Sequence, residues 1–259
     1  MYEGLGATVT YNILKKQGDT AVTRYRDQKT VEKTINDFKT RIEKIDSPEA
    51  LLKDRRALEF VLTSFQLESE IGKTGILRKL LTEDPTEEKS LANRLVDPRY
   101  TKLATSLSGK IPEAFQNESF VNGLINNYVT NTFEKSVGEG NTGLREALYF
   151  KRNIANVTSV SQILADRALS YVVRKGLNLP DSFAMQDFDQ QKRYLEKKLD
   201  LTKFKDPGYV EKFTQRFLTQ VSATESSSAS SNVALQILGG SGGSDGLTSL
   251  LGRKVSILV

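Results

Sequence analysis

Carboxylates, lysines, tyrosines and serines are the side chains through which this chain could carry out acid–base or nucleophilic chemistry. The 259 residues include no histidine and no cysteine, which excludes an imidazole base, a thiolate nucleophile, an ordinary zinc site and a disulfide framework. Paired acids such as Glu68 with Glu70 could act as a general acid and base, but they lie in strongly polar sequence. Glu87 and Glu88 are better explained as favourable partners of a helix N-terminus.

Two further patterns have features of a binding or catalytic site. The stretch GEGNTG at 138–143 is glycine-rich and precedes a predicted helix, as a phosphate-binding loop would. It lacks the Lys-Ser/Thr ending of a P-loop and follows a helix instead of a strand, so a linker is the better interpretation. Asp54 and Asp166 each stand next to an arginine, which helix-packing ion pairs or exposed charges explain at least as well as a site. The sequence therefore predicts no catalytic residue, no metal ligand and no cofactor, and a protein that is not an enzyme.

Apolar residues recur at helical spacing along most of the chain and predict an all-α fold. Val31, Ile35, Phe38, Ile42 and Ile45 share one helix face. No sustained alternation of the strand type occurs. With 38% hydrophobic and 27% charged residues, the composition is typical of a soluble globular protein. No run approaches the roughly 20 apolar residues that a transmembrane helix needs.

One helical unit occurs twice. The stretch ILADRALSYVV at 163–173 parallels LLKDRRALEFVL at 51–62 if one residue is inserted in the first copy. The matched positions are Phe38 with Phe150, Asp54 with Asp166, and Phe60 with Tyr171. Ser47 is expected to cap the N-terminus of a helix, and Ser159 is expected to form a capping box with Gln162.

Each copy closes with the same four-residue pattern, DPRY at 97–100 and DPGY at 206–209. In both, the aspartate is expected to cap a helix, the proline to occupy its first position, and the tyrosine to enter the core. This structural role is favoured over a tyrosine–carboxylate site. The residues concerned are Asp97, Pro98 and Tyr100 in the first copy and Asp206, Pro207 and Tyr209 in the second.

The predicted architecture is one pseudo-symmetric bundle or two adjacent bundles of helices. Its parts are an N-terminal arm (1–29), repeat 1 (30–110), a bridging helix and linker (111–141), repeat 2 (142–222) and a tail (223–259). The tail is rich in serine and glycine, which predicts flexibility, but it carries short apolar patches. These patches could fold back onto the helices, dock onto a partner or a second copy, or do neither. The candidate docking residues are Leu235, Ile237, Leu238, Leu250, Leu251, Ile257 and Leu258.

Charge and the N-terminal sequence bear on partners and location. The net charge is +5, from 37 basic and 32 acidic residues. Its basic clusters are short and lie among acids, whereas a nucleic-acid-binding protein usually concentrates its charge on one face. The start, MYEGLGATVTY, lacks the basic and apolar segments of a cleavable signal peptide. We therefore expect no nucleic-acid partner, and a location in the cytoplasm or export without a cleaved signal.

Three stretches carry a resemblance to a known family: VDPRYTKLATSL, NNYVTNTFEKSVGEGNTGLREALYFKRNIANVTSVSQILADRALSYVV and DPGYVEKFTQRFL. Over roughly residues 25–222 the chain resembles an uncharacterised, all-helical bacterial family of unknown function, often encoded among genes for the flagellar basal body and motor. That family has no established catalytic residue or cofactor.

The resemblance implies a structural or protein-interaction role in flagellar assembly or motility, with a protein or a second copy as partner. Two helical repeats would offer grooves for the helices of such a partner. The alternative is a small-molecule enzyme or regulator that uses carboxylates or a lysine in a cleft between the repeats.

Overall fold

Helices make up the regular structure of the chain. The computed structural model describes residues 5–239, with side chains described as far as Thr224, and no strand occurs among these residues, which confirms the all-α fold. The chain divides into two compact units, Met1–Val221 and Ser222–Val259, and both repeats lie in the first. Within residues 5–239, no helix is both long enough and apolar enough to cross a membrane.

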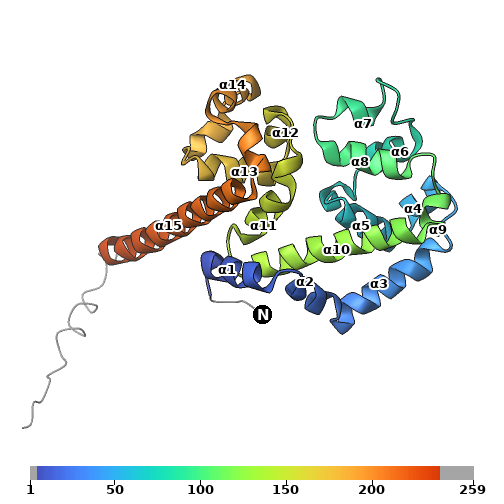
Figure 1. Cartoon of the computed structure of the whole chain (residues 1–259), viewed down its shortest axis with the longest axis horizontal. Helices are drawn as coiled ribbons and strands as arrows, with labels where there is room; N and C mark the ends of the chain where they lie inside the picture. Colours follow the sequence, from blue (N-terminus) through green and yellow to red (C-terminus); the bar gives the residue numbers. More distant parts are fainter. Residues whose placement is uncertain (1–4, 240–259) are drawn as a thin grey trace, which may run out of the picture. The chain divides into compact units, whose positions relative to one another are not determined.

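The elements follow one another along the chain with short connections (Figure 1). The α-helices are α1 (Ala7–Gln17), α2 (Asp19–Arg26), α3 (Lys29–Ile42), α4 (Pro48–Lys53), α5 (Arg55–Ser64), α6 (Thr74–Thr82), α7 (Leu91–Arg94), α8 (Pro98–Leu107), α9 (Glu113–Gln116), α10 (Glu118–Gly138), α11 (Leu144–Asn153), α12 (Val160–Ala165), α13 (Arg167–Gly176), α14 (Phe188–Lys198) and α15 (Pro207–Gly239). The 3₁₀ helices are η1 (Glu68–Glu70), η2 (Ile154–Asn156), η3 (Asp181–Met185) and η4 (Leu201–Lys205).

The first unit contains two separate apolar cores. The first core draws its buried side chains from residues 31–129 and therefore belongs to repeat 1. The second core draws on residues 133–221, which include repeat 2, and also on residues 7–21 at the N-terminus. Each repeat thus buries its own helix stripes, as the periodicity of apolar residues predicts.

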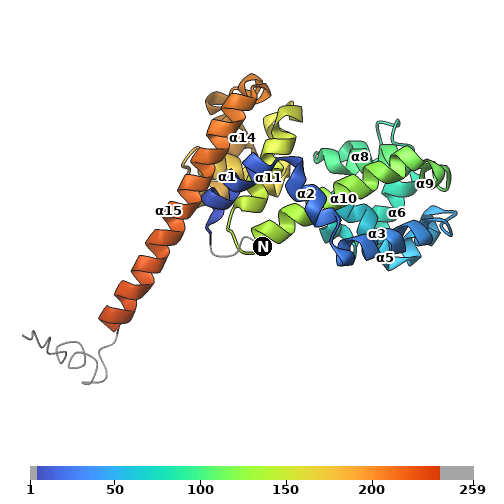
Figure 2. The same ribbon diagram turned by 60° about the horizontal axis from the view of Figure 1, so that its bottom comes forward.

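The bridging helix α10 contributes to both cores. Its N-terminal part places Leu124 and Ile125 in the first core, and its C-terminal part places Phe133 and Val137 in the second. Figures 1 and 2 both show α10 passing from the helices of repeat 1 towards α11 and α1. Helix α10 is therefore part of both cores and connects the two repeats within one compact unit.

Two pairs of helix caps in the repeats lie 112 residues apart, whereas the caps Asp97 and Asp206 lie 109 residues apart. Ser47 accepts a hydrogen bond from the backbone N–H of the third residue of α4, and Ser159 does the same in α12. Asp54 caps α5 and Asp166 caps α13 in the same way. The Oε1 of Gln162 accepts from the N–H of Thr158, one residue earlier than a capping box requires.

The sequence alignment of α5 with α13 is wrong by one residue. It inserts a residue in the first copy, whereas both helices have ten residues and begin 112 positions apart. Phe60 therefore corresponds to Val172, and both are buried. Tyr171 stands instead at the position of the exposed Glu59 and is half-buried. The chemical likeness of two aromatic residues is thus a poorer guide to register than the periodicity of the buried face.

Both D-P-x-Y stretches begin helices. In α8, Asp97 accepts a hydrogen bond from the N–H of Arg99 at 2.9 Å. In α15, Asp206 accepts from the N–H groups of Gly208 and Tyr209 at 3.0 and 3.2 Å. Pro98 and Pro207 are the first helical residues, and the tyrosines that follow, Tyr100 and Tyr209, are half-buried at the edges of the two cores.

The N-terminal arm forms α1 and α2, and α1 packs into the second core. Tyr11 and Leu14 of α1 are buried there. The hydroxyl of Tyr11 donates to Glu211 of α15 at 2.8 Å, and the same carboxylate receives Lys15 at 2.8 Å and Lys151 at 3.2 Å. Burial alone would raise the pKa of Glu211, but hydrogen bonds from Lys15, Tyr11 and Lys151 outweigh it and lower the pKa to about 2.

Glu211→Gln is expected to destabilise the protein by about 2 kcal/mol at pH 7. Because the folded pKa of Glu211 lies below its ordinary value of 4.5, its stabilisation is complete above pH 4.5 and is lost as the pH falls towards 2. Between pH 4.5 and pH 2 the free energy of unfolding, measured by urea denaturation, should therefore fall less steeply in the variant than in the wild type. Glu196→Gln is the control, because the carboxylate of Glu196 is exposed and lies 3.9 Å from Lys192. This variant should change the free energy of unfolding by less than about 0.5 kcal/mol. If the two variants lose stability equally as the pH falls, Glu211 does not stabilise the packing of α1.

Helix α15 continues to Gly239, where the composition predicts flexible chain from residue 223. No glycine or proline occurs between Gly208 and Gly239, so nothing in the sequence breaks the helix until the glycine pair at its end. Of the candidate docking residues, Leu235, Ile237 and Leu238 fall in this helix. The others, Leu250, Leu251, Ile257 and Leu258, lie outside the described residues.

Candidate functional site

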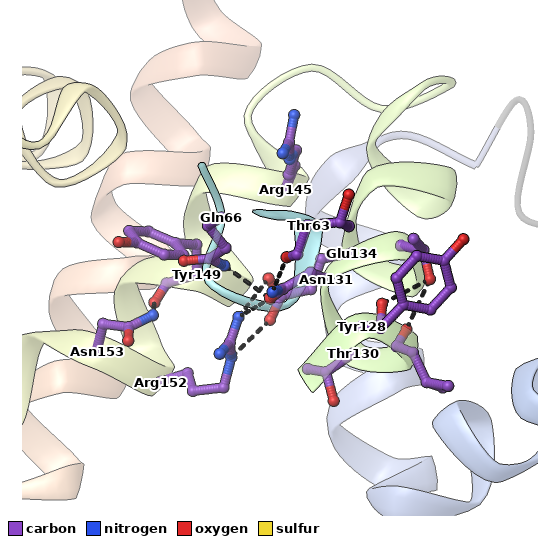
Figure 3. Close-up of polar contacts among 12 residues, drawn as sticks. Thr63, Gln66, Tyr128, Thr130, Asn131, Glu134, Arg145, Tyr149, Arg152 and Asn153 are labelled. Carbon is purple, nitrogen blue, oxygen red and sulfur yellow. Dashed lines mark hydrogen bonds and ion pairs between the residues drawn. The ribbon is translucent and has the colours of Figure 1, made fainter. Parts of the chain in front are cut away.

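A polar junction joins the two repeats, with Asn131 of α10 at its centre (Figure 3). The side-chain oxygen of Asn131 accepts hydrogen bonds from Gln66, just after α5 of repeat 1, and from Arg152 of α11, both at 2.7 Å. Its amide nitrogen donates to the carbonyl of Thr63 at 2.8 Å. Asn131 is buried, and these contacts satisfy its amide from both sides of the junction.

Arg152 also forms a two-bond ion pair with Glu134. Its Nε donates to Oε1 at 3.0 Å and its Nη2 donates to Oε2 at 2.9 Å. The carboxylate of Glu134 is buried, and burial raises its pKa above the ordinary value although Arg152 opposes the shift. A second pair, from Arg145 to Glu68 at 2.8 Å, also crosses from α11 to repeat 1, but it is more exposed.

The caps of α8 and α13 flank the same junction. Asp166 is buried and accepts hydrogen bonds from Ala168, Leu169 and the hydroxyl of Tyr149. Burial, followed by the charge of Asp166, raises the pKa of Tyr149, so its phenol stays protonated at neutral pH.

On the repeat 1 side of the junction, Arg99 donates from Nε and Nη2 to Asp97 and from Nη1 to the carbonyl of Gln66 at 3.0 Å. The guanidinium group of Arg99 is thus engaged by its own repeat.

A cleft of about 250 Å³ opens between the repeats at this junction. Arg99, Arg152, Tyr149 and Asp166 line it, together with Lys102, which forms no ion pair among the described residues. General acid–base catalysis is most efficient with a group whose pKa is near the working pH, whereas Tyr149 is shifted away from neutrality. Over the described part of the chain, no group of three or more acidic side chains is placed to hold a metal ion.

A larger groove of about 620 Å³ lies on repeat 1, lined by α3, α5 and α10; we call it the aromatic groove. Phe38, Phe60 and Tyr128 stack in series beneath it, with ring centroids 3.8 and 3.9 Å apart and nearly parallel planes. The other lining residues are Lys33, Thr34, Asp37, Arg41, Arg56, Glu59, Thr63, Glu68, Asn131, Thr132 and Lys135.

The junction was not foreseen from the sequence. Asn131 and Glu134 are polar residues that lie three positions apart on a helix with apolar residues in the neighbouring turns. The expected burial of that helix face is the one signal in the sequence that indicates them. Asp97 and Asp166 were singled out, but as a cap and as a charge near arginine. Of the two, Asp166 lines the cleft, whereas Asp97 holds Arg99, which lines it.

Comparison with known proteins agrees with the fold. A crystal structure of protein AGR_C_984 from Agrobacterium tumefaciens is similar, with a TM-score of 0.73 and 30% identity over 83% of this chain and 92% of that one. No curated protein matches the sequence. The family described as "Protein of unknown function (DUF1217)" matches residues 64–210, which run from the end of α5 to the start of α15 and include every residue of the junction except Thr63. The chain belongs to this family of unknown function.

Proposed function

We propose that this chain is a non-catalytic structural or protein-interaction protein that serves flagellar assembly or motility. The observation that carries the proposal is the use of the ionisable groups between the repeats. Arg152 pairs with Glu134, Arg99 pairs with Asp97, and Asp166 caps α13. Groups engaged in this way stabilise the arrangement of the repeats and are poorly suited to act on a substrate.

The partner is another protein or a second copy of the chain, and nucleic acid is not expected. The aromatic groove supports this part of the proposal, since its volume of about 620 Å³ and its mixed polar and aromatic lining suit side chains from a partner. The flagellar association rests on the family resemblance described above. The expected location is the cytoplasm, or outside it after export without a cleaved signal.

The second candidate is a small-molecule enzyme or regulator that acts in the cleft between the repeats. The observation that favours it is Lys102, a cation without an ion-pair partner among the described residues, beside Asp166 and Tyr149. A ligand at Lys102 would be able to act on the arrangement of the repeats, because Arg99, which Asp97 holds, and Asp166, the cap of α13, line the same cleft.

Complementation of a deletion strain separates the two candidates. We expect deletion to reduce motility on soft agar, and both the wild-type gene and Asp166→Asn to restore it. Asparagine caps helices as well as aspartate does, so the variant should remain folded while it removes the cleft carboxylate. Failure of a folded Asp166→Asn protein to restore motility would favour the enzyme or regulator. Normal motility of the deletion strain would remove the flagellar association.

A further inference from the structure

Repeat 2 presents an apolar tip between η3 and α14, made of Met185 and Phe188. Met185 is 88% exposed and Phe188 is 47% exposed, although both are large hydrophobic residues. They lie three positions apart, on a segment that packs against the second core through other residues. Exposed apolar residues that lie together mark sites of interaction more often than single ones do.

The tip is held rigidly. Phe183 is buried in the second core, and its ring meets Tyr194 edge to face with centroids 5.2 Å apart. The amide of Gln191 donates to the carbonyl oxygens of Ala184 and Gln186 at 3.4 and 2.7 Å. A segment fixed in this way loses little conformational freedom when it binds, which favours affinity.

Two carboxylates stand next to Phe188 in the tip, and the cations Lys192 and Arg193 follow one turn later on α14. Asp187 and Asp189 flank Phe188, are exposed, and form no salt bridge with another described residue. Asp181, at the start of η3, is engaged by Lys175 at 3.0 Å. A surface that receives this tip must therefore offer an apolar floor and a basic rim.

The aromatic groove of repeat 1 has both features. The half-buried ring of Tyr128 forms the accessible part of its floor and stacks on the buried rings of Phe60 and Phe38. Lys33 and Lys135 on its rim are exposed and form no ion pair among the described residues.

Arg56 adds a third cation to the rim, 3.8 Å from Asp37. Of the lining carboxylates, Asp37 is held by Arg41 and Glu68 by Arg145, which leaves Glu59 as the one without a salt bridge in the described structure. The rim therefore has an excess of positive charge for the tip to meet.

Repeat 2 does not reproduce this groove. At the 112-residue spacing of α5 and α13, Val172 stands in place of Phe60, so the stack of three rings is lost. The position of Lys33 is taken by Arg145, which is paired with Glu68. In the described part of each chain there is therefore one apolar tip and one aromatic groove, on different surfaces.

We propose that the apolar tip of one copy docks in the aromatic groove of a second copy. Since the two surfaces differ, the contact is head-to-tail, and each added chain leaves a free tip and a free groove. Such a contact builds a ring or an open filament instead of a two-fold dimer. The inference rests on the proposed function, because it names a second copy as the partner.

The test measures the mass of the full chain by light scattering over a range of concentrations. The wild-type protein should form species larger than a dimer, and higher salt should weaken them. Met185→Glu with Phe188→Glu removes the tip, and Lys33→Glu with Lys135→Glu reverses the charge of the groove. Each double variant should weaken association at least tenfold without lowering the melting temperature, since all four residues are exposed.

A mixture of the two double variants is the decisive sample. One variant keeps a working groove and the other a working tip, so the mixture should form a dimer of one copy of each and nothing larger. Val96→Glu, a change at a residue 53% exposed in repeat 1, is the matched control and should assemble as the wild type does. A monomeric wild-type protein, assembly that survives both double variants, or a mixture that stays monomeric would overturn the proposal.

Cross-linking gives an independent measurement, because the chain has no cysteine of its own. Met185→Cys in one chain and Thr132→Cys, which lines the groove, in another should form a disulfide when mixed. The pairing of Met185→Cys with Val96→Cys should not. If the double variants lose assembly but keep normal motility, the contact is supported and the proposed role in motility is contradicted.

Discussion

Arg152→Ala is expected to lower the free energy of unfolding by about 3 kcal/mol at pH 8, and by clearly less at pH 5. The change leaves the buried carboxylate of Glu134 without its two-bond partner. It also removes one of the two donors to the side-chain oxygen of Asn131. An uncompensated buried charge is among the most destabilising defects that a single substitution creates.

The pH dependence of this effect has a definite sign. Burial already raises the pKa of Glu134 in the folded protein, and loss of Arg152 raises it further. A carboxyl group with a raised folded pKa imposes no penalty below its unfolded pKa, and the penalty grows as the pH rises towards the folded value. Urea denaturation at pH 5, 6.5 and 8 measures the trend. Arg145→Ala breaks a more exposed pair and should cost no more than about 1 kcal/mol. An equal loss at pH 5 and pH 8 would show that Glu134 is not the cause.

Asp97→Ala is expected to cost about 3 kcal/mol, whereas Asp206→Ala should cost about 1 kcal/mol. Both aspartates cap helices in equivalent D-P-x-Y stretches, so the cap itself is matched. Asp97 is buried and also holds the guanidinium of Arg99 through Nε and Nη2. Asp206 is exposed, and glycine stands where Arg99 stands in the first copy.

Melting and urea denaturation of the two alanine variants test this difference directly. Arg99→Ala, combined with Asp97→Ala, should recover part of the loss because the unpaired cation is then absent. Similar costs for the two single variants would mean that Arg99 finds water or another partner when Asp97 is removed.

Local features of the fold were predictable from the sequence, because helix stripes and caps depend on residues a few positions apart. The stripe of Val31, Ile35 and Phe38 lies in the first core, and the caps at Ser47 and Ser159 depend on the next three residues. The likeness of Phe60 to Tyr171 misled the alignment because it compared residue types across positions with different burial. The serine-rich sequence after Val221 contains no glycine or proline before Gly239, and α15 continues to that residue.

The junction could not be predicted, because it is made of contacts between distant residues. Gln66 and Asn131 are 65 positions apart, and Arg145 and Glu68 are 77 apart. Neither pair produces a periodic pattern in the sequence, because each adds a single polar side chain to a helix whose apolar residues have ordinary helical spacing. The aromatic groove is similar in kind, because its floor joins Phe38, Phe60 and Tyr128 from three helices.

The path of α1 has a consequence for the order in which the protein matures on the ribosome. The first core uses residues 31–129, so it can close once the first half of the chain has emerged. Tyr11 is made before any of it, yet its partner Glu211 is 200 positions later. During synthesis the first helix therefore lacks this partner on α15 until nearly the whole first unit has left the exit tunnel. Docking of α1 then serves as a completion step, which seals the second core after repeat 1 is already folded.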